Sequence, residues 1–226
     1  MMKMPDASPQ EPAATMVSRW LDPRPGLIVW DFDLTVLNTH AFGEGVEVED
    51  VSARWHKDVR DLELFKLFVE TAVKEGSAVG VASYGRKDVI AEYMRHIFAG
   101  SAQQPFTPAN IVTPSAFGVP DGACPVIHVP TCPQRCMHCR PTHVACSAPI
   151  AGTSIPSGKP QMLDMLRQVA TVQDRSAVIF FDDDPENVTD CQAAGYKRTF
   201  HTPDGFSRQQ LRRLESGSNS RRCVVE

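Results

Sequence analysis

The sequence Gly26-Leu27-Ile28-Val29-Trp30-Asp31-Phe32-Asp33-Leu34-Thr35 joins a short apolar run directly to two aspartates. An apolar run of this length that ends in acidic residues is typical of a buried central strand in a parallel sheet. In such sheets, ligands bind at the carboxyl ends of the strands. The stretch therefore predicts the first strand of the sheet and the edge at which polar groups gather.

Helix and strand patterns alternate along the chain after this first strand. Apolar residues fall at helical spacing from 58 to 75, with Gly76 as the expected C-cap. An apolar run over 77–82 predicts a second strand, and 86–98 predicts a second helix. Further elements are expected as a strand at 111–112, a helix at 161–169 and a strand at 177–181. This alternation predicts an α/β fold, a three-layer α/β/α Rossmann-like sandwich around a central parallel sheet.

Composition shifts divide the chain into a central domain and two ends. Residues 1–24 are rich in proline, which predicts a flexible N-terminal tail in which only 16–21 are apolar enough to pack. Residues 25–205 are expected to form the domain. It is interrupted at 119–156 by an insertion rich in Pro, Cys, Thr and His that is too long for an ordinary loop. Residues 206–226 predict a C-terminal helix followed by a frayed end.

The bulk composition argues against several classes of protein. At 226 residues and 42% hydrophobic content, the chain is long enough for one soluble globular domain with a sizeable core. A net charge of -4 predicts neither a nucleic-acid partner nor a membrane partner, because both favour basic surfaces. The sequence has neither an apolar stretch of about 20 residues nor the apolar core of a signal peptide, so a cytoplasmic protein is expected.

Polar side chains follow three of the predicted strands, at the point where each strand ends. Asp31 and Asp33 follow the first strand, Ser83 follows the second, and residues 182–184, all aspartate, follow the last. Because the carboxyl ends of parallel strands share one edge, we expect these side chains to lie close together. Neighbouring carboxylates repel one another unless a cation compensates, and hard oxygen ligands suit magnesium. The sequence therefore predicts a Mg²⁺ site at this edge.

The spacing of Asp31 and Asp33 allows a division of labour. Two residues apart at a strand end, their side chains emerge on the same side. One carboxylate can attack phosphorus to give an aspartyl-phosphate, while the other protonates the leaving oxygen and later activates water. An Asp-x-Asp pair in a loop is more often a solvated turn. The apolar strand before this pair and the acidic cluster after the last strand favour the catalytic interpretation.

Four segments occur in the order of the sequence motifs of the haloacid-dehalogenase superfamily. Asp31-Phe32-Asp33-Leu34-Thr35 resembles the first motif, and Ser83 after an apolar strand resembles the second. Lys159 in Ser157-Gly158-Lys159-Pro160 resembles the third, and Phe181-Asp182-Asp183-Asp184-Pro185-Glu186-Asn187 resembles the fourth. The resemblance covers the predicted strands and leaves out both ends and the insertion. It implies a haloacid-dehalogenase-like catalytic domain with a minimal cap.

The resemblance implies a role for each matching residue. Asp31 would be the nucleophile, and Asp33 the general acid and base. Ser83 would donate a hydrogen bond to the phosphoryl oxygens, although a serine here can also cap the following helix. Lys159 would be the cationic clamp on the same oxygens. The implied magnesium ligands are the side chains of Asp31, Asp182 and Asp183 and the main-chain carbonyl of Asp33.

The second acidic position also bears on the type of reaction. An aspartate there favours phosphate-ester hydrolysis, because a leaving alkoxide needs a proton. Thr35 and Phe180-Phe181-Asp182-Asp183 resemble the eukaryotic magnesium-dependent phosphatases and the carboxy-terminal-domain phosphatases. Residues 36–57 suffice for a flap but are too few for a helical lid domain, which implies an open site. We therefore expect a phosphomonoester hydrolase acting on a phosphoprotein, with a small metabolite such as a sugar phosphate as the alternative substrate.

Two rival functions differ from hydrolysis. A phosphotransferase or phosphomutase could use the same aspartyl-phosphate, but water competes at an open site, and transfer to another acceptor generally needs enclosure. A scaffold protein could keep the fold and bind a partner through the cysteine-rich insertion. The presence of Asp31, Asp33 and Lys159 together argues against the scaffold.

The insertion contains most of the seven cysteines of the chain. A reducing compartment disfavours disulfides and favours free thiols or metal ligands. Five side chains have ligand types and spacings compatible with a tetrahedral Zn²⁺ site: Cys132, Cys136, Cys139, His143 and Cys146. The alternative is a proline-rich loop of reduced thiols. Cys191 lies outside the insertion, and we expect it to serve helix packing.

Overall fold

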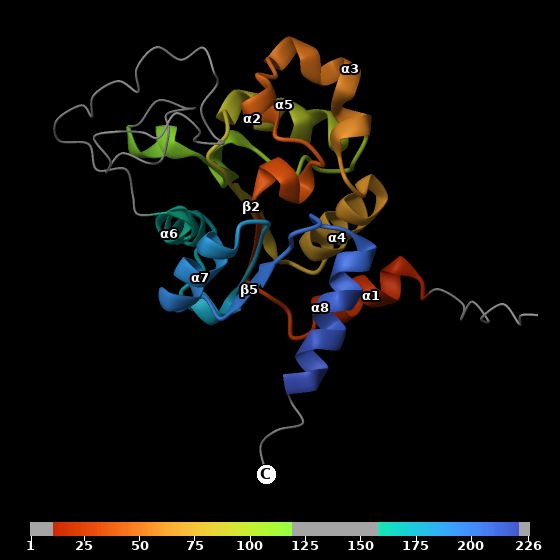
Figure 1. The fold of residues 1–226 in the computed structure, drawn as a ribbon, viewed down its shortest axis with the longest axis vertical. Helices are drawn as coiled ribbons and strands as arrows, with labels where there is room; N and C mark the ends of the chain where they lie inside the picture. Colours follow the sequence, from red (N-terminus) through yellow and green to blue (C-terminus); the bar gives the residue numbers. More distant parts are fainter. Residues whose placement is uncertain (1–10, 119–157, 222–226) are drawn as a thin grey trace, which may run out of the picture.

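The described part of the chain, residues 11–118 and 158–221 of the computed structural model, is built around a parallel sheet. The sheet has five strands in the order β3-β2-β1-β4-β5, and every neighbouring pair is parallel. The strands are β1 (Leu27–Trp30), β2 (Ala78–Ala82), β3 (Ile111–Val112), β4 (Val178–Asp182) and β5 (Arg198–His201). Helices flank the sheet on both faces (Figure 1), which confirms the predicted α/β class with a central parallel sheet.

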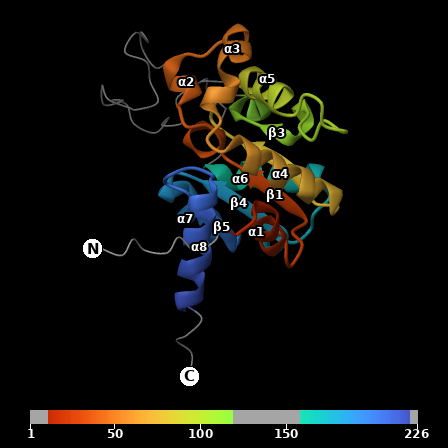
Figure 2. The same ribbon diagram turned by 90° about the vertical axis from the view of Figure 1, so that its right-hand side faces the viewer.

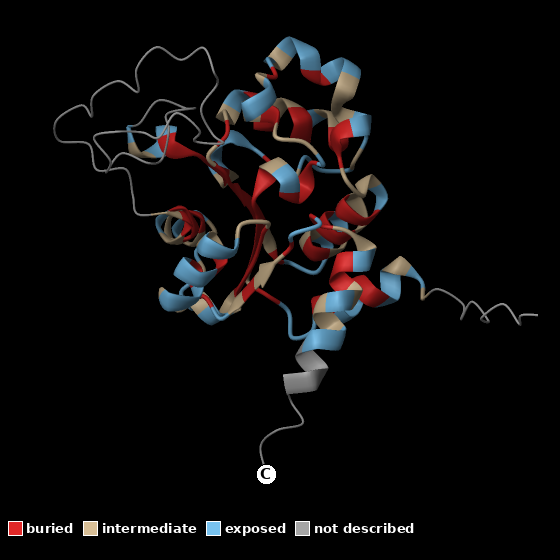
Figure 3. Ribbon diagram, in the orientation of Figure 1, coloured by how far each residue is buried: buried red, intermediate tan, exposed pale blue. Residues whose placement is uncertain are grey.

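Alternate residues of the strands supply two apolar cores, one on each face of the sheet. Ile28 and Trp30 of β1 belong to the larger core, and Leu27 and Val29 belong to the smaller one. The larger core is covered by α1 (Ala13–Trp20), α4 (Leu62–Lys74), α5 (Lys87–Ile97) and α8 (Arg208–Arg221). The smaller core is covered by α6 (Lys159–Val169) and α7 (Pro185–Ala193). Figure 2 views the sheet from the side of α4 and α8, and Figure 3 shows how strongly burial concentrates on the strands.

Helix α6 approaches the sheet closely at Gly80. A Cβ atom built on Gly80 would lie 2.9 Å from Leu166 Cδ2 and 3.2 Å from the carbonyl oxygen of Asn110. Lys159 is the first residue of α6, and Leu166 follows about two turns later. The missing side chain at Gly80 therefore sets how near the helix that carries Lys159 can come to β2.

The strand register places the predicted polar residues at one edge of the sheet. Trp30 of β1 pairs with β2 on one side and with Phe181 of β4 on the other. The Asp31 N–H continues this pairing and donates to the Phe181 carbonyl oxygen at 2.8 Å. Ser83 follows β2 directly, and Asp182 is the last residue of β4. The carboxyl ends of three neighbouring strands thus meet where the sequence predicts.

The segment between β1 and α4 is more helical than predicted. The helix expected over 58–75 begins only at α4, where the Asp61 side chain accepts a hydrogen bond from the Leu64 N–H at 3.2 Å. Residues 36–57, which we call the flap, contain most of two further helices, α2 (Ala41–Glu44) and α3 (Val48–Asp58). Extended backbone at Val59 separates α3 from α4. Because α3 packs against α5, the flap is anchored along the side of the sheet that carries the larger core.

The N-terminal segment is not a tail over its whole predicted length. Helix α1 lies within it, and both Met16 and Trp20 are buried in the larger core. The Trp20 ring centroid lies 5.6 Å from that of Phe181 and 4.9 Å from that of Phe200. Residues 16–21, the part of the predicted tail that is apolar enough to pack, therefore dock onto the sheet within and just after α1, which begins three residues earlier, at Ala13.

Other predictions fall at or beyond the limits of the described residues. The insertion predicted at 119–156 lies outside them, and so do the candidate zinc ligands Cys132, Cys136, Cys139, His143 and Cys146. Helix α8 begins at Arg208, within the segment for which a C-terminal helix is predicted. Among the helices of the two described ranges, none combines the length and apolar character needed to cross a lipid bilayer.

The docking of α1 can be tested by changing its buried tryptophan. Trp20→Ala should destabilise the protein by about 3 to 5 kcal/mol, because it removes a large side chain from the larger core. Urea unfolding followed by circular dichroism measures this loss. Val169→Ala is the control: Val169 is 52% exposed, and its truncation should cost less than about 0.5 kcal/mol. Equally small losses in the two variants would contradict the docking of α1.

The smaller core makes a prediction about Cys191 on α7. This side chain is buried, and burial raises the pKa of its thiol to about 12. Because the thiolate is the reactive form, a raised pKa slows alkylation near neutral pH. We predict that Cys191 resists iodoacetamide in the folded protein and reacts once urea unfolds it. Mass spectrometry of its peptide gives the rate, and rapid labelling of the folded protein would contradict this packing.

Candidate active site

The chain turns sharply after β1, and this turn directs the side chains of the first acidic segment. Leu34 has φ 60° and ψ -14°, in the left-handed region that favours glycine. The Leu34 N–H donates to the Thr39 carbonyl oxygen at 3.2 Å. The Leu34 carbonyl oxygen faces Gly205, where an added Cβ atom would lie 2.7 Å from it. After this turn, Thr35 Oγ1 donates to Asp183 Oδ1 at 3.0 Å. Thr35, just after the turn at Leu34, thus links the loop after β1 to the loop after β4.

Three carboxylates from the ends of two neighbouring strands meet at this edge of the sheet. Carboxylate oxygens of Asp31, Asp182 and Asp183 all lie within 4.8 Å of one another. Lys159 directs its ammonium group into this cluster, where it forms an ion pair with Asp31 and another, at 3.2 Å, with Asp182. It also donates to the Ala82 carbonyl oxygen at 2.9 Å. Residues from three distant parts of the sequence are therefore brought into one cluster.

Hydrogen bonds from the start of α7 orient the carboxylate of Asp182, and a side chain of β5 contacts the main chain of Asp183. Asp182 Oδ1 accepts from the Asp184 N–H at 2.8 Å and from Asn187 Nδ2 at 3.1 Å. The main-chain carbonyl oxygen of Asp183 lies 2.9 Å from His201 Nε2. Asp184 itself caps α7 and does not join the cluster. The third consecutive aspartate therefore supports the site through the helix start.

Burial makes the cluster electrostatically unfavourable without a further cation. Burial raises the pKa of Asp31 well above its usual range, and Asp182 and Asp183 raise it further, while Lys159 lowers it. Burial, followed by the charge of Asp182, also raises the pKa of Asp183. Burial alone would lower the pKa of Lys159, but Asp182 and Asp31 outweigh it and raise that pKa. One ammonium group thus faces three carboxylates, which leaves an excess of negative charge.

The donor set of the cluster fits a divalent cation with a preference for oxygen ligands. Asp31, Asp182 and Asp183 offer converging carboxylate oxygens, which are hard ligands of the kind that Mg²⁺ prefers. A divalent charge would offset the negative charge that Lys159 leaves uncompensated. The chemistry of these residues therefore suits the magnesium ion predicted from the sequence.

Asp33 lies beside the cluster and directs its carboxylate toward the flap. Oδ1 accepts from the Ala41 N–H at 3.0 Å, and Oδ2 accepts from the Phe42 N–H at 3.4 Å. Oδ2 also lies 3.0 Å from His40 Nδ1. The carboxylate is therefore outside the group formed by the other three aspartates, which leaves the main-chain carbonyl of Asp33 as its predicted contribution to a metal site.

His40 Nδ1 has two neighbours that make opposite demands on it. Asp33 Oδ2, at 3.0 Å, needs a hydrogen on this nitrogen, whereas the Gly43 N–H, also at 3.0 Å, needs its lone pair. One nitrogen cannot satisfy both at the same time. A hydrogen bond to a charged carboxylate is stronger than one from a neutral backbone N–H. Nδ1 is therefore assigned as the donor to Asp33, and this contact also raises the pKa of His40.

Ser83 lies at the end of β2, buried and close to Asp33. Its Oγ accepts a hydrogen bond from the Gly85 N–H at 3.1 Å, so it closes the turn before α5 and can still donate through its own O–H. A Cβ atom on Gly85 would lie 3.4 Å from Ser83 Oγ and 3.8 Å from Asp33 Oδ2. Ser83 Oγ and Asp33 Oδ2 thus both border the space beside Gly85.

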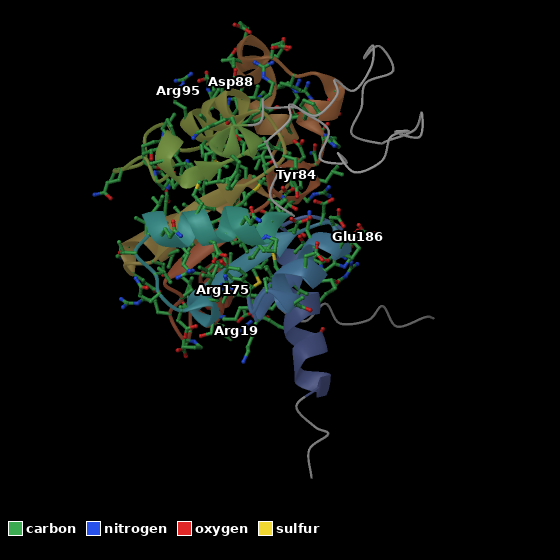
Figure 4. All side chains as sticks on the ribbon, turned by 90° about the vertical axis from the view of Figure 1, so that its left-hand side faces the viewer. Arg19, Tyr84, Asp88, Arg95, Arg175 and Glu186 are labelled. Atoms are coloured by element: carbon green, nitrogen blue, oxygen red, sulfur yellow. The ribbon has the colours of Figure 1, made fainter. Side chains whose placement is uncertain are left out.

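Aromatic rings cover the Lys159 ammonium group. Its nitrogen lies 5.0 Å from the ring centroid of Tyr84 and 5.9 Å from that of Phe180. Such contacts favour a cation over the ring face. Figure 4 shows Tyr84 near the end of α6 at which Lys159 lies. Sequence reasoning does not identify Tyr84, because a contact between a cation and a ring leaves no spacing pattern.

No protein-family model matches the sequence, and no curated protein matches it significantly. The geometry of the cluster and the order of its residues in the chain are therefore the basis for a functional assignment.

Proposed function

We propose that this chain is a magnesium-dependent phosphatase of the haloacid-dehalogenase type that hydrolyses phosphomonoesters through an aspartyl-phosphate on Asp31. The observation that carries the proposal is the ion pair of Asp31 with the buried ammonium group of Lys159, inside the cluster of three carboxylates. A carboxylate held at the carboxyl edge of a parallel sheet is well placed to attack a ligand that binds there. The order of the four sequence motifs supports the same assignment.

In the first step, a carboxylate oxygen of Asp31 attacks phosphorus, and the bond between phosphorus and the ester oxygen breaks. Asp33 gives a proton to that oxygen, so the alcohol leaves in its neutral form. Ser83 donates its hydroxyl hydrogen to a phosphoryl oxygen, and Lys159 attracts the phosphoryl oxygens through its charge. The products of this step are the aspartyl-phosphate, the free alcohol and ionised Asp33.

In the second step, Asp33 removes a proton from a water molecule as the water oxygen attacks phosphorus. The bond between phosphorus and the Asp31 oxygen breaks, which releases inorganic phosphate and restores both carboxyl groups to their starting forms. To transfer protons, the carboxyl group of Asp33 must lie near the phosphoryl group but apart from the three clustered carboxylates. The hydrogen bond from the Ala41 N–H, at 3.0 Å, draws it toward α2 and is consistent with this position.

Magnesium is the proposed cofactor. Its side-chain ligands would be Asp31, Asp182 and Asp183, with the main-chain carbonyl of Asp33 as a further ligand. When bound there, the ion would neutralise negative charge on the transferring phosphoryl group. Thr35 orients Asp183 through its hydroxyl, and Asn187 orients Asp182 through its amide.

The surroundings of the site favour a phosphoprotein or another large phosphomonoester as substrate. The cavity between the flap and α5, beside Asp33, measures only about 10 Å³, which is about the space of one water molecule. Among the described residues, this side of the site offers no chamber that would enclose a sugar phosphate. A small metabolite remains the alternative substrate and would need the flap to move outward.

The rival functions are separated by phosphate release. A phosphotransferase would release little phosphate until an acceptor alcohol is added, whereas a phosphatase needs only water. A scaffold protein would release no phosphate from any ester. Assays with phosphopeptides, sugar phosphates and nucleotides, each with Mg²⁺ and with or without an acceptor, distinguish the three functions.

The nucleophile assignment predicts the effect of Asp31→Asn. Because an amide oxygen cannot replace the carboxylate as nucleophile, this change should lower kcat by at least about a thousandfold. Asp174→Asn is the matched control, since Asp174 is exposed at the opposite end of β4 and should leave kcat unchanged. Phosphate release under saturating substrate is the measurement. An Asp31→Asn variant with normal turnover would exclude this residue as the nucleophile.

The metal assignment predicts opposite effects of Asp183→Asn in two conditions. Without metal, the variant should melt at a higher temperature than the unchanged protein, because one of three repelling carboxylates has been neutralised. With Mg²⁺, the unchanged protein should gain stability, and EDTA should reverse this gain together with the activity. The variant should gain much less. Differential scanning fluorimetry tests this, and an equal Mg²⁺ response in both proteins would place the ion elsewhere.

A further inference from the structure

We propose that His40 is a positioning residue whose Nδ1–H group holds the carboxyl group of Asp33 in the orientation needed to protonate the leaving group. The inference rests on the proposed function, because it gives His40 a part in the first step of that reaction. It adds a residue outside the four motif segments, taken from the flap.

Three donors surround the Asp33 carboxyl group, and His40 is the nearest donor to one of its two oxygens. Oδ1 has one donor, the Ala41 N–H at 3.0 Å. Oδ2 has two, the Phe42 N–H at 3.4 Å and His40 Nδ1 at 3.0 Å. A donor 3.4 Å away contributes little, because hydrogen bonds from nitrogen to oxygen are normally shorter. His40 therefore supplies the main restraint on Oδ2, and without it Oδ2 keeps only the long contact from the Phe42 N–H, so the carboxyl group is held mainly at Oδ1.

The pair is shielded enough for this restraint to matter. The side chain of His40 is 27% exposed and that of Asp33 is 12% exposed. Hydrogen bonds to a charged group are stronger when water is partly excluded, whereas fully exposed pairs contribute little. A contact in this environment can fix an orientation that a solvated surface contact would not.

The flap holds the imidazole ring from both directions along the chain. On the N-terminal side, the Thr39 carbonyl oxygen accepts from the Leu34 N–H at 3.2 Å, so the residue before His40 is tied to the turn after β1. On the C-terminal side, Glu47 forms an ion pair with Arg86, the residue before α5. The segment that carries His40 is thus tied to the main body of the protein before and after α2.

A role in orienting Asp33 has a chemical signature that a purely structural role lacks. The more basic the leaving oxygen is, the more the rate of the first step depends on proton transfer from Asp33. Phenyl phosphate releases a strongly basic phenolate, whereas 4-nitrophenyl phosphate has nearly the same shape and releases a much more stable phenolate. Misplacing Asp33 should therefore impair hydrolysis of the first ester more than that of the second.

The test compares kcat/KM for these two esters, with Mg²⁺, in four proteins. The value of kcat/KM reports the steps up to departure of the leaving group and is not affected by slow hydrolysis of the aspartyl-phosphate. The proteins are the unchanged chain, His40→Ala, His40→Asn and His56→Ala. Asparagine can present an amide N–H to Asp33, and His56, an exposed residue of α3, is the matched control in the same flap.

For His40→Ala, we expect kcat/KM to fall by about tenfold or more on phenyl phosphate and by less than about threefold on 4-nitrophenyl phosphate. A tenfold loss is reasonable for a misplaced general acid, because complete general acid catalysis contributes about a hundredfold or more. His40→Asn should recover most of the loss, and His56→Ala should behave as the unchanged protein. The ratio of the two values within one protein does not depend on how much of the sample is folded. Poor folding therefore cannot produce the expected pattern.

Two results would overturn the inference while leaving the phosphatase proposal intact. One is an equal change on both esters in His40→Ala, including no change, and the other is a His40→Asn variant no better than His40→Ala. If the unchanged protein releases phosphate from neither these two esters nor the phosphopeptides, sugar phosphates and nucleotides, the proposed function is contradicted, and the role of His40 falls with it.

Discussion

A buried ammonium group must find its partners inside the protein, because water can no longer solvate it. Lys159 is 1% exposed, and its contacts are Asp31 after β1, the Ala82 carbonyl oxygen in β2 and Asp182 in β4. One side chain can reach all three only if these neighbouring strands end at the same level. Lys159 can therefore be paired only if three conditions are met together. They are the parallel register of the strands, the point at which α6 begins and the distance of α6 from the sheet.

The two carboxylates of the first acidic segment depend on different parts of the molecule. Asp31 belongs to the end of the sheet and contacts the cation of α6, so its surroundings are as rigid as the core beneath it. The Asp33 carboxylate receives its hydrogen bonds from residues 40–42, at the start of α2. In the proposed reaction, attack on phosphorus is thus assigned to the rigid sheet, while proton transfer is assigned to a side chain whose orientation follows the flap.

The sequence predicts the centre of the sheet well, because β1, β2 and β4 are apolar runs buried on both faces. It does not predict β5, whose residues Arg-Thr-Phe-His are mixed because an edge strand covers only part of the core. It allows residues 16–21 to pack but does not predict where, since the docking of α1 depends on the rings of Phe181 and Phe200 that Trp20 meets on the sheet. Asp31, Asp182 and Lys159 could be foreseen from their order along the chain. The contact of His40 with Asp33 could not, because it depends on the left-handed turn at Leu34.

The close approach of α6 at Gly80 has a consequence for reading natural variation in this protein. Gly80 carries no polar group and lies within a buried strand, so a change to alanine there would pass for conservative. Yet the added methyl group would lie 2.9 Å from Leu166 Cδ2 and 3.2 Å from the Asn110 carbonyl oxygen, so these neighbours would have to shift. Leu166 is buried and belongs to the same helix as Lys159, so the shift would be taken up within the packing that carries the ammonium group. A substitution remote from every charged residue would in this way bear on the surroundings of Lys159, and Gly80 should be considered with the charged residues when the severity of variants is judged.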